Sequence, residues 1–281
     1  MDELISVIVT TYNREDVLDV VLRSLAHQTD KDFEVVVADD GSGSATAAVV
    51  GAWKDRLGRR LDHVWHEDRG FRAAEIRNRA TLVSRGSYCI FLDGDCIVRP
   101  DFVATHRRLA ARGRFVTGSR TLLSASLTDK VLREKLAPET WSFVDWAGER
   151  LRGGVNRLSP LLRLPLGPLR GLRQSVWQGA RSCNLAIWRA DLDRVDGFDS
   201  DYSGWGKEDS DIIVRLLHAG VRRKDGVFAT GVLHLWHREA DRGRLAENER
   251  RLSDIVAGDR VRARHGLSAL QAAPVTTRAT V

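Results

Sequence analysis

Two carboxylates at alternate positions give the most specific chemical signal in this sequence. Asp93 and Asp95 occur in FLDGDC, where the preceding IFL predicts a buried strand that ends at the first of them. Such a pair of hard oxygen donors can share a divalent cation with a diphosphate, because Mg²⁺ and Mn²⁺ keep part of their coordination for ligand and water. A D-x-D pair alone usually marks a solvated turn, so its meaning depends on the rest of the chain.

A second acidic cluster occurs in GWGKEDSD. Glu208, Asp209 and Asp211 fall within four positions behind Trp205, which stands between two glycines. Like charges this close repel one another unless they serve a cation, a proton transfer or a helix N-terminus. Capping by Asp209 or Ser210 would explain part of the cluster. It does not explain the tryptophan or Glu208, so a chemical role is also expected.

Two further strand ends carry polar residues, in VTTYNRED and in ADDGSG. Ligands of open parallel sheets bind beside the carboxyl ends of the strands, so both ends are candidates for binding. The simpler alternative is local capping, in which Asn13 or Asp39 only closes a turn. The candidate binding residues at these ends are Thr10, Tyr12, Arg14 and Asp40.

The elements that must position these residues follow an α/β pattern. LISVIV and FEVVVA are short β-branched runs typical of strands buried on both faces of a parallel sheet. Leucines and valines recur at helical spacing between them, which predicts a βαβ unit. The expected strands are 4–9, 33–38, 61–65 and 88–92, and the expected helices are 73–83 and 209–219.

The segment 120–173 differs from the rest of the chain in composition, because it is rich in leucine and arginine and contains four prolines. Prolines interrupt any long regular element. Such an insertion could cover an active site, bind an acceptor or rest on an anionic membrane. The alternative is a set of short core helices with arginine on the wet face. Farther on, 242–264 predicts a highly charged helix, and 271–281 a disordered tail.

Composition limits the class of protein. The 281 residues are 43% hydrophobic and 29% charged, which fits a globular chain with a sizeable core. The net charge is +6, and arginine supplies most of the excess, which favours partners that bear phosphate or carboxylate. No nucleic-acid motif is present. Three unpaired cysteines and no secretory or spanning segment predict a cytoplasmic protein, with peripheral contact at the inner face of an anionic membrane as an option.

These motifs together resemble a known family. TYNR, DDGS, GFRAAEIRN and FLDGD, in this order over about residues 4–120, resemble the nucleotide-sugar-binding half of family 2 glycosyltransferases with the GT-A fold. GWGKED is similar to the G-W-G-x-E-D segment of β-1,4-galactosyltransferases and of bacterial chondroitin polymerase transferase domains. The resemblance implies a single α/β GT-A domain over 1–270. Its expected parts are a nucleotide-sugar-binding half at 1–119, the insertion at 120–173 and an acceptor-binding half at 174–270.

The resemblance also implies roles for residues. Asp95 would be the principal carboxylate for Mn²⁺ or Mg²⁺, and His237 in LWHRE a second metal ligand, with His234 as the fallback. Asp209 would be the general base, while Trp205 and Glu208 would bind the acceptor sugar. Cys183 is expected to pack. The residues expected around a UDP carrier are Thr10, Tyr12, Arg14, Asp40, Arg72, Arg77 and Asp93, and those expected near the donor sugar are Gly179, Arg181 and Asn184.

The function implied is a metal-dependent, inverting transferase. It would move a hexose or N-acetylhexosamine from a UDP-sugar to a hydroxyl of a glycan or glycolipid, in bacterial surface polysaccharide or lipopolysaccharide synthesis. Two alternatives stay open from the sequence. One is a retaining transferase or sugar nucleotidyltransferase with the same nucleotide half. The other is a module that binds glycan or nucleic acid without turnover.

Overall fold

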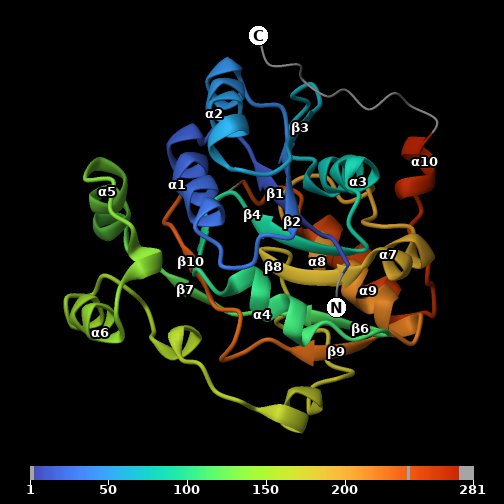
Figure 1. Ribbon diagram of the computed structural model, residues 1–281. Coiled ribbons are helices and arrows are strands. Elements are labelled where there is room, and N and C mark those ends of the chain that lie inside the picture. The colour runs from blue at the N-terminus through green and yellow to red at the C-terminus, as the bar shows by residue number, and fades with distance from the viewer. Residues whose placement is uncertain (1–2, 239–240, 272–281) are drawn as a thin grey trace.

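A seven-stranded sheet forms the centre of the computed structural model, which describes residues 3–238 and 241–271 (Figure 1). The strand order is β3-β2-β1-β4-β8-β6-β9. The first four strands along the chain pair in parallel, β8 is antiparallel to both of its neighbours, and β6 is parallel to β9. The strands are β1 (Ile5–Thr11), β2 (Phe33–Asp39), β3 (Leu61–Trp65), β4 (Tyr88–Asp93), β6 (Arg114–Thr117), β8 (Asn184–Trp188) and β9 (Arg222–Asp225).

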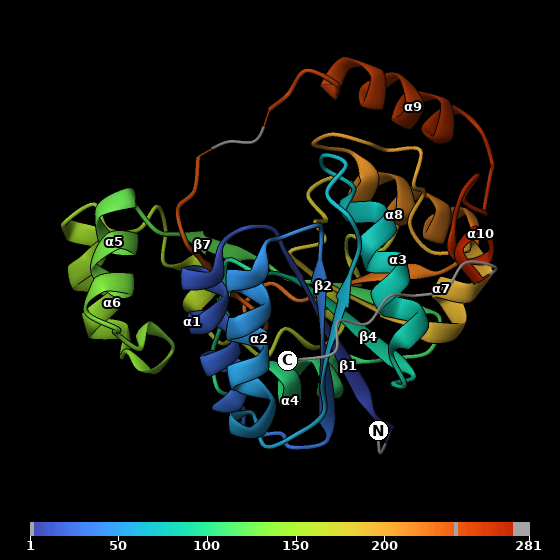
Figure 2. The same ribbon diagram turned by 90° about the horizontal axis from the view of Figure 1, so that it is seen from above.

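Helices cover both faces of this sheet. Side chains alternate along each strand, so Val7 packs into one apolar core and Ile8 into the other. One face is covered by α1 (Glu15–Ala26), α2 (Ser44–Arg56) and α4 (Phe102–Leu109). The other is covered by α3 (Ala73–Val83), α7 (Arg189–Val195) and α8 (Glu208–His218). Outside α8 lies α9 (Leu245–Ala257), and α10 (Leu267–Gln271) contacts α3 (Figure 2).

A small three-stranded sheet stands beside the end of β4. It consists of β5 (Cys96–Val98), β10 (Val232–His234) and β7 (Arg120–Leu122), in the order β5-β10-β7. Its register pairs His234 with Cys96, and the backbone N–H of Leu235 donates to the carbonyl of Asp95 at 2.9 Å. A histidine from the C-terminal part of the chain is thereby fixed next to the D-x-D turn.

After β7, the segment 120–173 consists of short helices and loops, so the second interpretation is right about short helices but wrong that they are all core helices. They are α5 (Ala125–Arg133), η1 (Pro138–Thr140), α6 (Phe143–Leu151), η2 (Ser159–Leu161) and η3 (Gly167–Gly171), and each 3₁₀ turn has a proline in its first two positions. Of the residues of α6, Trp146 alone is buried. Both α5 and α6 stand away from the main sheet in Figures 1 and 2.

The expected elements agree with the structure except near the C-terminus. The strand at 61–65 and the helix at 73–83 have the predicted bounds, and the helix predicted at 209–219 is α8, shifted by one residue. The helix predicted over 242–264 is wrong in extent, because α9 ends at Ala257 and Gly258 caps it in an extended conformation. Most of the predicted tail, 272–281, lies outside the described residues. No helix among the described residues combines the length and apolar character needed to cross a bilayer.

Candidate active site

A cleft of about 1120 Å³ opens at the carboxyl ends of β1, β2 and β4. This is where ligands bind in open α/β sheets. Its walls come from all parts of the chain, including residues 69–71, helix α5 and residues 236–238, with Asp241 and Arg244. The predicted residues that line it are Thr10, Tyr12, Arg14, Asp40, Arg77, Asp93, Asp95, Trp205 and His237.

One buried arginine joins three of the predicted motifs. Arg77 on α3 is 4% exposed, and its Nε donates to Thr10 Oγ1 at 3.1 Å. Its Nη2 donates to Asp93 Oδ1 and its Nη1 to Glu208 Oε1, each at 3.1 Å. Burial opposes the charge of this guanidinium, but the two carboxylates outweigh burial and raise its pKa. The D-x-D turn and the GWGKED segment therefore both contact one guanidinium group, that of Arg77.

The acidic cluster behind Trp205 begins a helix, but its carboxylates do not cap it. The N-cap residue of α8 is Lys207 (φ 78°), and no side chain caps the helix. Asp209 Oδ1 accepts hydrogen bonds from the N–H of the adjacent Ser210, at 2.7 Å, and from the Ser210 hydroxyl, so the prediction that Asp209 or Ser210 is the N-cap is wrong. Glu208, Asp209 and Asp211 do lie in the first turn, where negative charge complements the helix dipole, so the helix N-terminus explains part of the cluster. Burial, and then the neighbouring Asp209, raise the pKa of Glu208 to about 7, against the effect of Arg77.

Asp95 and both histidines of the LHLWH stretch lie together. Asp95 Oδ2 is 3.5 Å from His234 Nε2 and 3.3 Å from His237 Nε2, and the three ligand atoms lie within 4.8 Å of one another. Burial lowers the pKa of His234, so its imidazole is neutral and has a lone pair for a metal. One carboxylate and two imidazoles form a donor set that can hold a first-row divalent metal ion, and the set does not by itself distinguish Mn²⁺ from Fe²⁺ or Zn²⁺. The resemblance favoured His237 as the metal ligand, with His234 as the fallback, and both histidines lie next to Asp95.

A second group of metal-ligand type has a different explanation. Asp199, Asp201 and His265 also lie within 4.8 Å of one another, but they do not line the cleft. The Asp199 carboxylate accepts backbone N–H groups of Asp201, Arg264 and His265, and Asp201 Oδ1 lies 2.6 Å from His265 Nδ1. These bonds close a turn without a cation.

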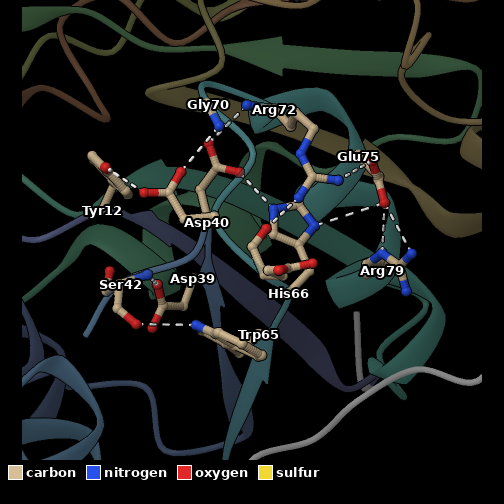
Figure 3. A network of polar contacts seen from close by, with 12 residues as sticks. Tyr12, Asp39, Asp40, Ser42, Trp65, His66, Gly70, Arg72, Glu75 and Arg79 are labelled. Atoms are coloured by element: carbon tan, nitrogen blue, oxygen red, sulfur yellow. Dashed lines mark hydrogen bonds and ion pairs between the residues drawn. The ribbon is translucent and has the colours of Figure 1, made fainter. Parts of the chain in front are cut away.

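A network of charged groups surrounds Asp40 at the nucleotide end of the cleft (Figure 3). Asp40 Oδ1 lies 2.6 Å from His66 Nε2, and Asp40 Oδ2 accepts the backbone N–H of Arg72 at 2.9 Å. The other ring nitrogen of His66, Nδ1, lies 3.7 Å from Glu75 Oε1. Burial opposes protonation of His66, but its bonds to Asp40 and Glu75 outweigh burial and raise its pKa. The close contact with His66 is also the main reason why the pKa of Glu75 falls to about 2.

Tyr12 presents its ring beside this network. Its hydroxyl donates to Asp68 Oδ2 at 2.9 Å, while the ring is 48% exposed in the cleft. Asn13 does not cap α1; its Oδ1 accepts the N–H of Gly43 and so ties the first two strand-end loops together. Asp39 does close its own turn, because its Oδ1 accepts the N–H of Ser42 at 2.8 Å.

Comparison with known sequences decides the family. The profile described as "Glycosyl transferase family 2" matches residues 6–176, and the one described as "N-terminal domain of galactosyltransferase" matches residues 173–237. The chain belongs to glycosyltransferase family 2. The first match includes the insertion, and the second includes the GWGKED segment.

Named relatives agree with this membership. Validoxylamine A glucosyltransferase of Streptomyces hygroscopicus subsp. limoneus is 34% identical over 78% of this chain and 49% of the relative. Chondroitin synthase of Escherichia coli is 28% identical over 77% of this chain and 32% of the relative. The chain thus spans about half the length of the first of these relatives, or less.

Solved structures show the same GT-A fold. The mannosyltransferase PcManGT from Pyrobaculum calidifontis, in complex with GDP-Man and Mn²⁺, has a TM-score of 0.55 at 22% identity over 89% of this chain and 61% of that chain. TarS 1-349 of S. aureus in complex with UDP-GlcNAc has a TM-score of 0.57 at 16% identity over 89% of this chain and 66% of that chain. The predicted fold class is confirmed.

Several candidates of this family 2 chain lie outside the cleft. The guanidinium of Arg72 turns to Glu75 and to the carbonyl of Glu67, so only its backbone N–H faces Asp40. Asn184 is 2% exposed, and its side-chain amide bonds to His106, Ser119 and Thr230, away from the cleft. Gly179 and Arg181 do not line the cleft, and Cys183 is buried.

The structure also adds residues that motif reasoning missed. Phe71 and Trp236 line the cleft and are 39% and 46% exposed. The Trp236 backbone N–H donates to Thr128 Oγ1 on α5 at 2.8 Å, so the insertion forms one wall of the cleft. The signal for Trp236 was present in LWH, between the two histidines, but a tryptophan is more often a core residue than a surface one.

Helix α9 holds the loop that carries Trp205. Asn248 is 1% exposed, and its Nδ2 donates to the carbonyl of Ser203 at 3.3 Å. Lys207 Nζ pairs with Glu249 Oε1 at 3.2 Å on the same helix. The Trp205 ring lies under the Arg242 guanidinium at 4.9 Å. The position of Trp205 thus depends on a helix more than forty residues away in the sequence.

Proposed function

We propose that this family 2 chain is a metal-dependent, inverting glycosyltransferase that moves a hexose or N-acetylhexosamine from a UDP-sugar to an acceptor hydroxyl. One observation supports this proposal above the others. Arg77 contacts both Asp93 and Glu208. The candidate metal ligands at the D-x-D turn and the candidate acceptor-binding residues in GWGKED therefore lie close together, and Asp95 and Trp205 line the same cleft.

In this proposal the nucleotide end of the cleft binds uridine. The Asp40 carboxylate accepts the N–H of the base, and His66 and the Arg72 backbone hold it in orientation. The exposed ring of Tyr12 lies against the base. Arg14 is at the cleft wall, 3.3 Å from Asp16, where its charge favours an anionic ligand.

Asp95, His234 and His237 would hold the divalent cation, with Asp93 and Arg77 beside them. A cation bound there would neutralise the charge that develops on the departing diphosphate. Arg77 adds a fixed positive charge that needs no reorganisation during the reaction. Because its guanidinium is already tied to Asp93 and Glu208, it would also hold the donor and acceptor sides in one geometry.

Asp209 would take the proton from the acceptor hydroxyl as that oxygen attacks the anomeric carbon. The hydroxyl becomes acidic only in the transition state, so a carboxylate that stays ionised is suited to the step. Glu208 would hydrogen-bond the acceptor sugar, and Trp205 would offer its ring to the apolar face of that sugar. A single displacement with UDP as the leaving group inverts the anomeric centre.

The acceptor class rests on the named relatives. The name validoxylamine A glucosyltransferase gives a glucosyl group and validoxylamine A as its acceptor, whereas chondroitin synthase and hyaluronan synthase name glycan products. The first name supports a hexose donor, and the other two support a glycan acceptor. An N-acetylhexosamine donor and a glycolipid acceptor are further parts of this proposal. A place in bacterial surface polysaccharide or lipopolysaccharide synthesis, at the cytoplasmic face of the membrane, is part of this proposal.

A panel of UDP-sugars tests the proposal directly. Thermal unfolding with and without Mn²⁺ identifies the donor, since a ligand that binds the native state raises the unfolding temperature. Incubation of that donor with a glycan acceptor should then release UDP, and NMR should find the inverted anomer. Retained configuration, or release of diphosphate in place of UDP, would identify one of the alternative enzymes. No UDP release with any UDP-sugar would favour a binding module.

The metal site gives a prediction of its own. Asp95→Asn and His234→Gln should each weaken Mn²⁺ binding by roughly tenfold or more, because each removes one of three donors. Isothermal titration of the protein with Mn²⁺, in the absence of any sugar, measures the effect. His265→Gln is the matched control, since its cluster with Asp199 and Asp201 is explained without a cation. The site assignment fails if the His265 variant loses affinity and the Asp95 variant does not.

Asn248 gives a second prediction, which rests on the acceptor role of Trp205. Asn248→Ala removes the hydrogen bond to Ser203, so the loop should hold Trp205 less firmly. We expect the acceptor KM to rise by roughly tenfold, while the slow hydrolysis of the UDP-sugar without acceptor stays unchanged. Ser253→Ala on the same helix is the control. Equal losses in acceptor KM and donor hydrolysis would show a general structural defect instead.

A further inference from the structure

The exposed apolar side chains of this protein are concentrated in one segment. Of the eleven large hydrophobic side chains that are exposed among the described residues, seven fall within 143–172 and three line the cleft. The seven are Phe143, Val144, Leu151, Leu162, Leu164, Leu169 and Leu172. Leu151 is 90% exposed and Leu172 is 78% exposed. Apolar groups gathered in this way mark interaction sites more often than scattered ones do.

Positive charge is concentrated in the same segment. Residues 143–173 contain six arginines and two acidic residues, Asp145 and Glu149, so this stretch carries a net charge of +4 of the +6 of the whole chain. Five of the six contact other groups of the fold. Arg163 pairs with Asp101 at 3.1 Å, and Arg170 is buried against backbone carbonyls. Arg152 pairs with Glu149 at 3.0 Å, and Arg157 and Arg173 donate to the carbonyls of Arg120 and Gln178. The arginines that are nevertheless exposed at the surface are Arg150, Arg152, Arg157 and Arg173.

The segment lies at the periphery of the molecule. From α6 to η3 it follows the lower edge of Figure 1 and makes few regular elements. Of the residues in α6, only Trp146 is buried, so the helix directs Phe143, Val144 and Leu151 outward. We call the seven exposed apolar side chains and the four surface arginines the Leu/Arg surface.

We propose that the Leu/Arg surface docks on an anionic phospholipid bilayer. Exposed leucines bury their side chains at the boundary between headgroups and acyl chains, and arginines bind lipid phosphate. Each basic residue near an anionic surface adds to the attraction. A second copy of this chain is a poor occupant, because two surfaces of the same positive charge would repel.

The position of the segment links docking to the cleft. Helix α5, which is separated from α6 by η1 alone, contributes Thr128 and Leu132 to the cleft wall. Docking would therefore bring the mouth of the cleft near the membrane. This inference needs only the surface itself, and it would stand if the proposed reaction were wrong.

Sedimentation with vesicles tests the proposal. We expect the full chain to bind vesicles made of equal parts phosphatidylcholine and phosphatidylglycerol, and not vesicles of phosphatidylcholine alone. Raising the salt concentration should weaken binding, because screening shortens the reach of the arginines. Arg150→Glu with Arg152→Glu should lower the partition coefficient by roughly tenfold or more. Leu151→Ser with Leu172→Ser should have an effect of similar size.

Two control variants lie on other surfaces. Arg85→Glu changes an exposed arginine outside the segment, and Val256→Ser changes the exposed apolar residue on α9. Both should bind vesicles as the wild type does, and circular dichroism melting should show that all variants fold. The proposal is overturned if the wild type binds both vesicle types equally or neither. It is also overturned if the controls lose binding as much as the segment variants, or if the leucine changes instead dissociate a dimer seen by ultracentrifugation.

Discussion

Asp209→Asn should lower kcat for sugar transfer by roughly 10² to 10⁴-fold, the usual contribution of a general base. The substitution keeps the shape of the side chain and can still accept the hydrogen bond from the Ser210 N–H. It removes the basic oxygen that the proposed mechanism needs when the acceptor hydroxyl loses its proton. The affinity for the UDP-sugar should change little, because Asp209 is not among the residues around the nucleotide end.

Single-turnover kinetics with the identified donor and acceptor measure this loss, and isothermal titration measures donor affinity. Asp16→Asn is the matched control. Asp16 also carries a carboxylate in the first turn of a helix, so its change removes the same charge; Asp16 lines the cleft, whereas Asp209 is not among the residues that line it. If Asp209→Asn keeps transfer within tenfold of the wild type, another group is the base, and Glu208, with its pKa of about 7, is the next to test.

Most of the fold followed from periodicity. The β-branched runs at 4–9 and 33–38 belong to strands that are buried on both faces, so they appear as nearly continuous apolar stretches that flank helical spacing. The helix predicted over 242–264 was too long because the sequence after Ala257 lacks the regularly spaced apolar residues that a packed helix needs. The charged residues after Gly258 continue in sequence as if in a helix, but they form a loop around Asp199 and Asp201.

The site was predictable where backbone topology alone sets it. Parallel strands end at one edge, so Thr10, Asp40 and Asp93 had to lie near each other. The choice between His234 and His237 depended on the register of β10 against β5, which no local pattern fixes. The contact between His66 and Asp40 was missed for a related reason, since a single histidine at the end of β3 gives no motif.

The contact between Arg77 and Glu208 lies beyond sequence reasoning, because 131 positions separate these residues. It depends on how α3 and α8 pack on the same face of the sheet. The motifs identified Arg77, Asp93 and Glu208 as candidates, but they could not show that the Arg77 guanidinium contacts both carboxylates. That shared contact makes Arg77 the residue whose loss should affect the stability of the site most.

Arg77→Ala should lower the free energy of unfolding by about 3–5 kcal/mol, because it leaves the carboxylates of Asp93 and Glu208 without their buried partner. Chemical denaturation at neutral pH measures the loss. Arg79→Ala on the same helix is the control; its pair with Glu75 is less buried, and Glu75 retains Arg72 and His66. A loss no larger than that of the control would mean that the bridge contributes little to stability.

The pH dependence of this loss follows from the pKa of Glu208. Its value of about 7 in the folded chain lies above its ordinary value of 4.5, so the folded state binds more protons between these values. The contribution of this group to stability is therefore full below about pH 4.5 and declines as the pH rises towards 7. Without Arg77 the pKa values of Glu208 and Asp93 rise further, and the decline extends to higher pH. The difference between wild type and Arg77→Ala should accordingly be larger at about pH 8 than at about pH 5. Equal differences at both pH values would show that the variant loses packing around Phe198, whose ring the guanidinium covers at 5.5 Å, and not a charge pair.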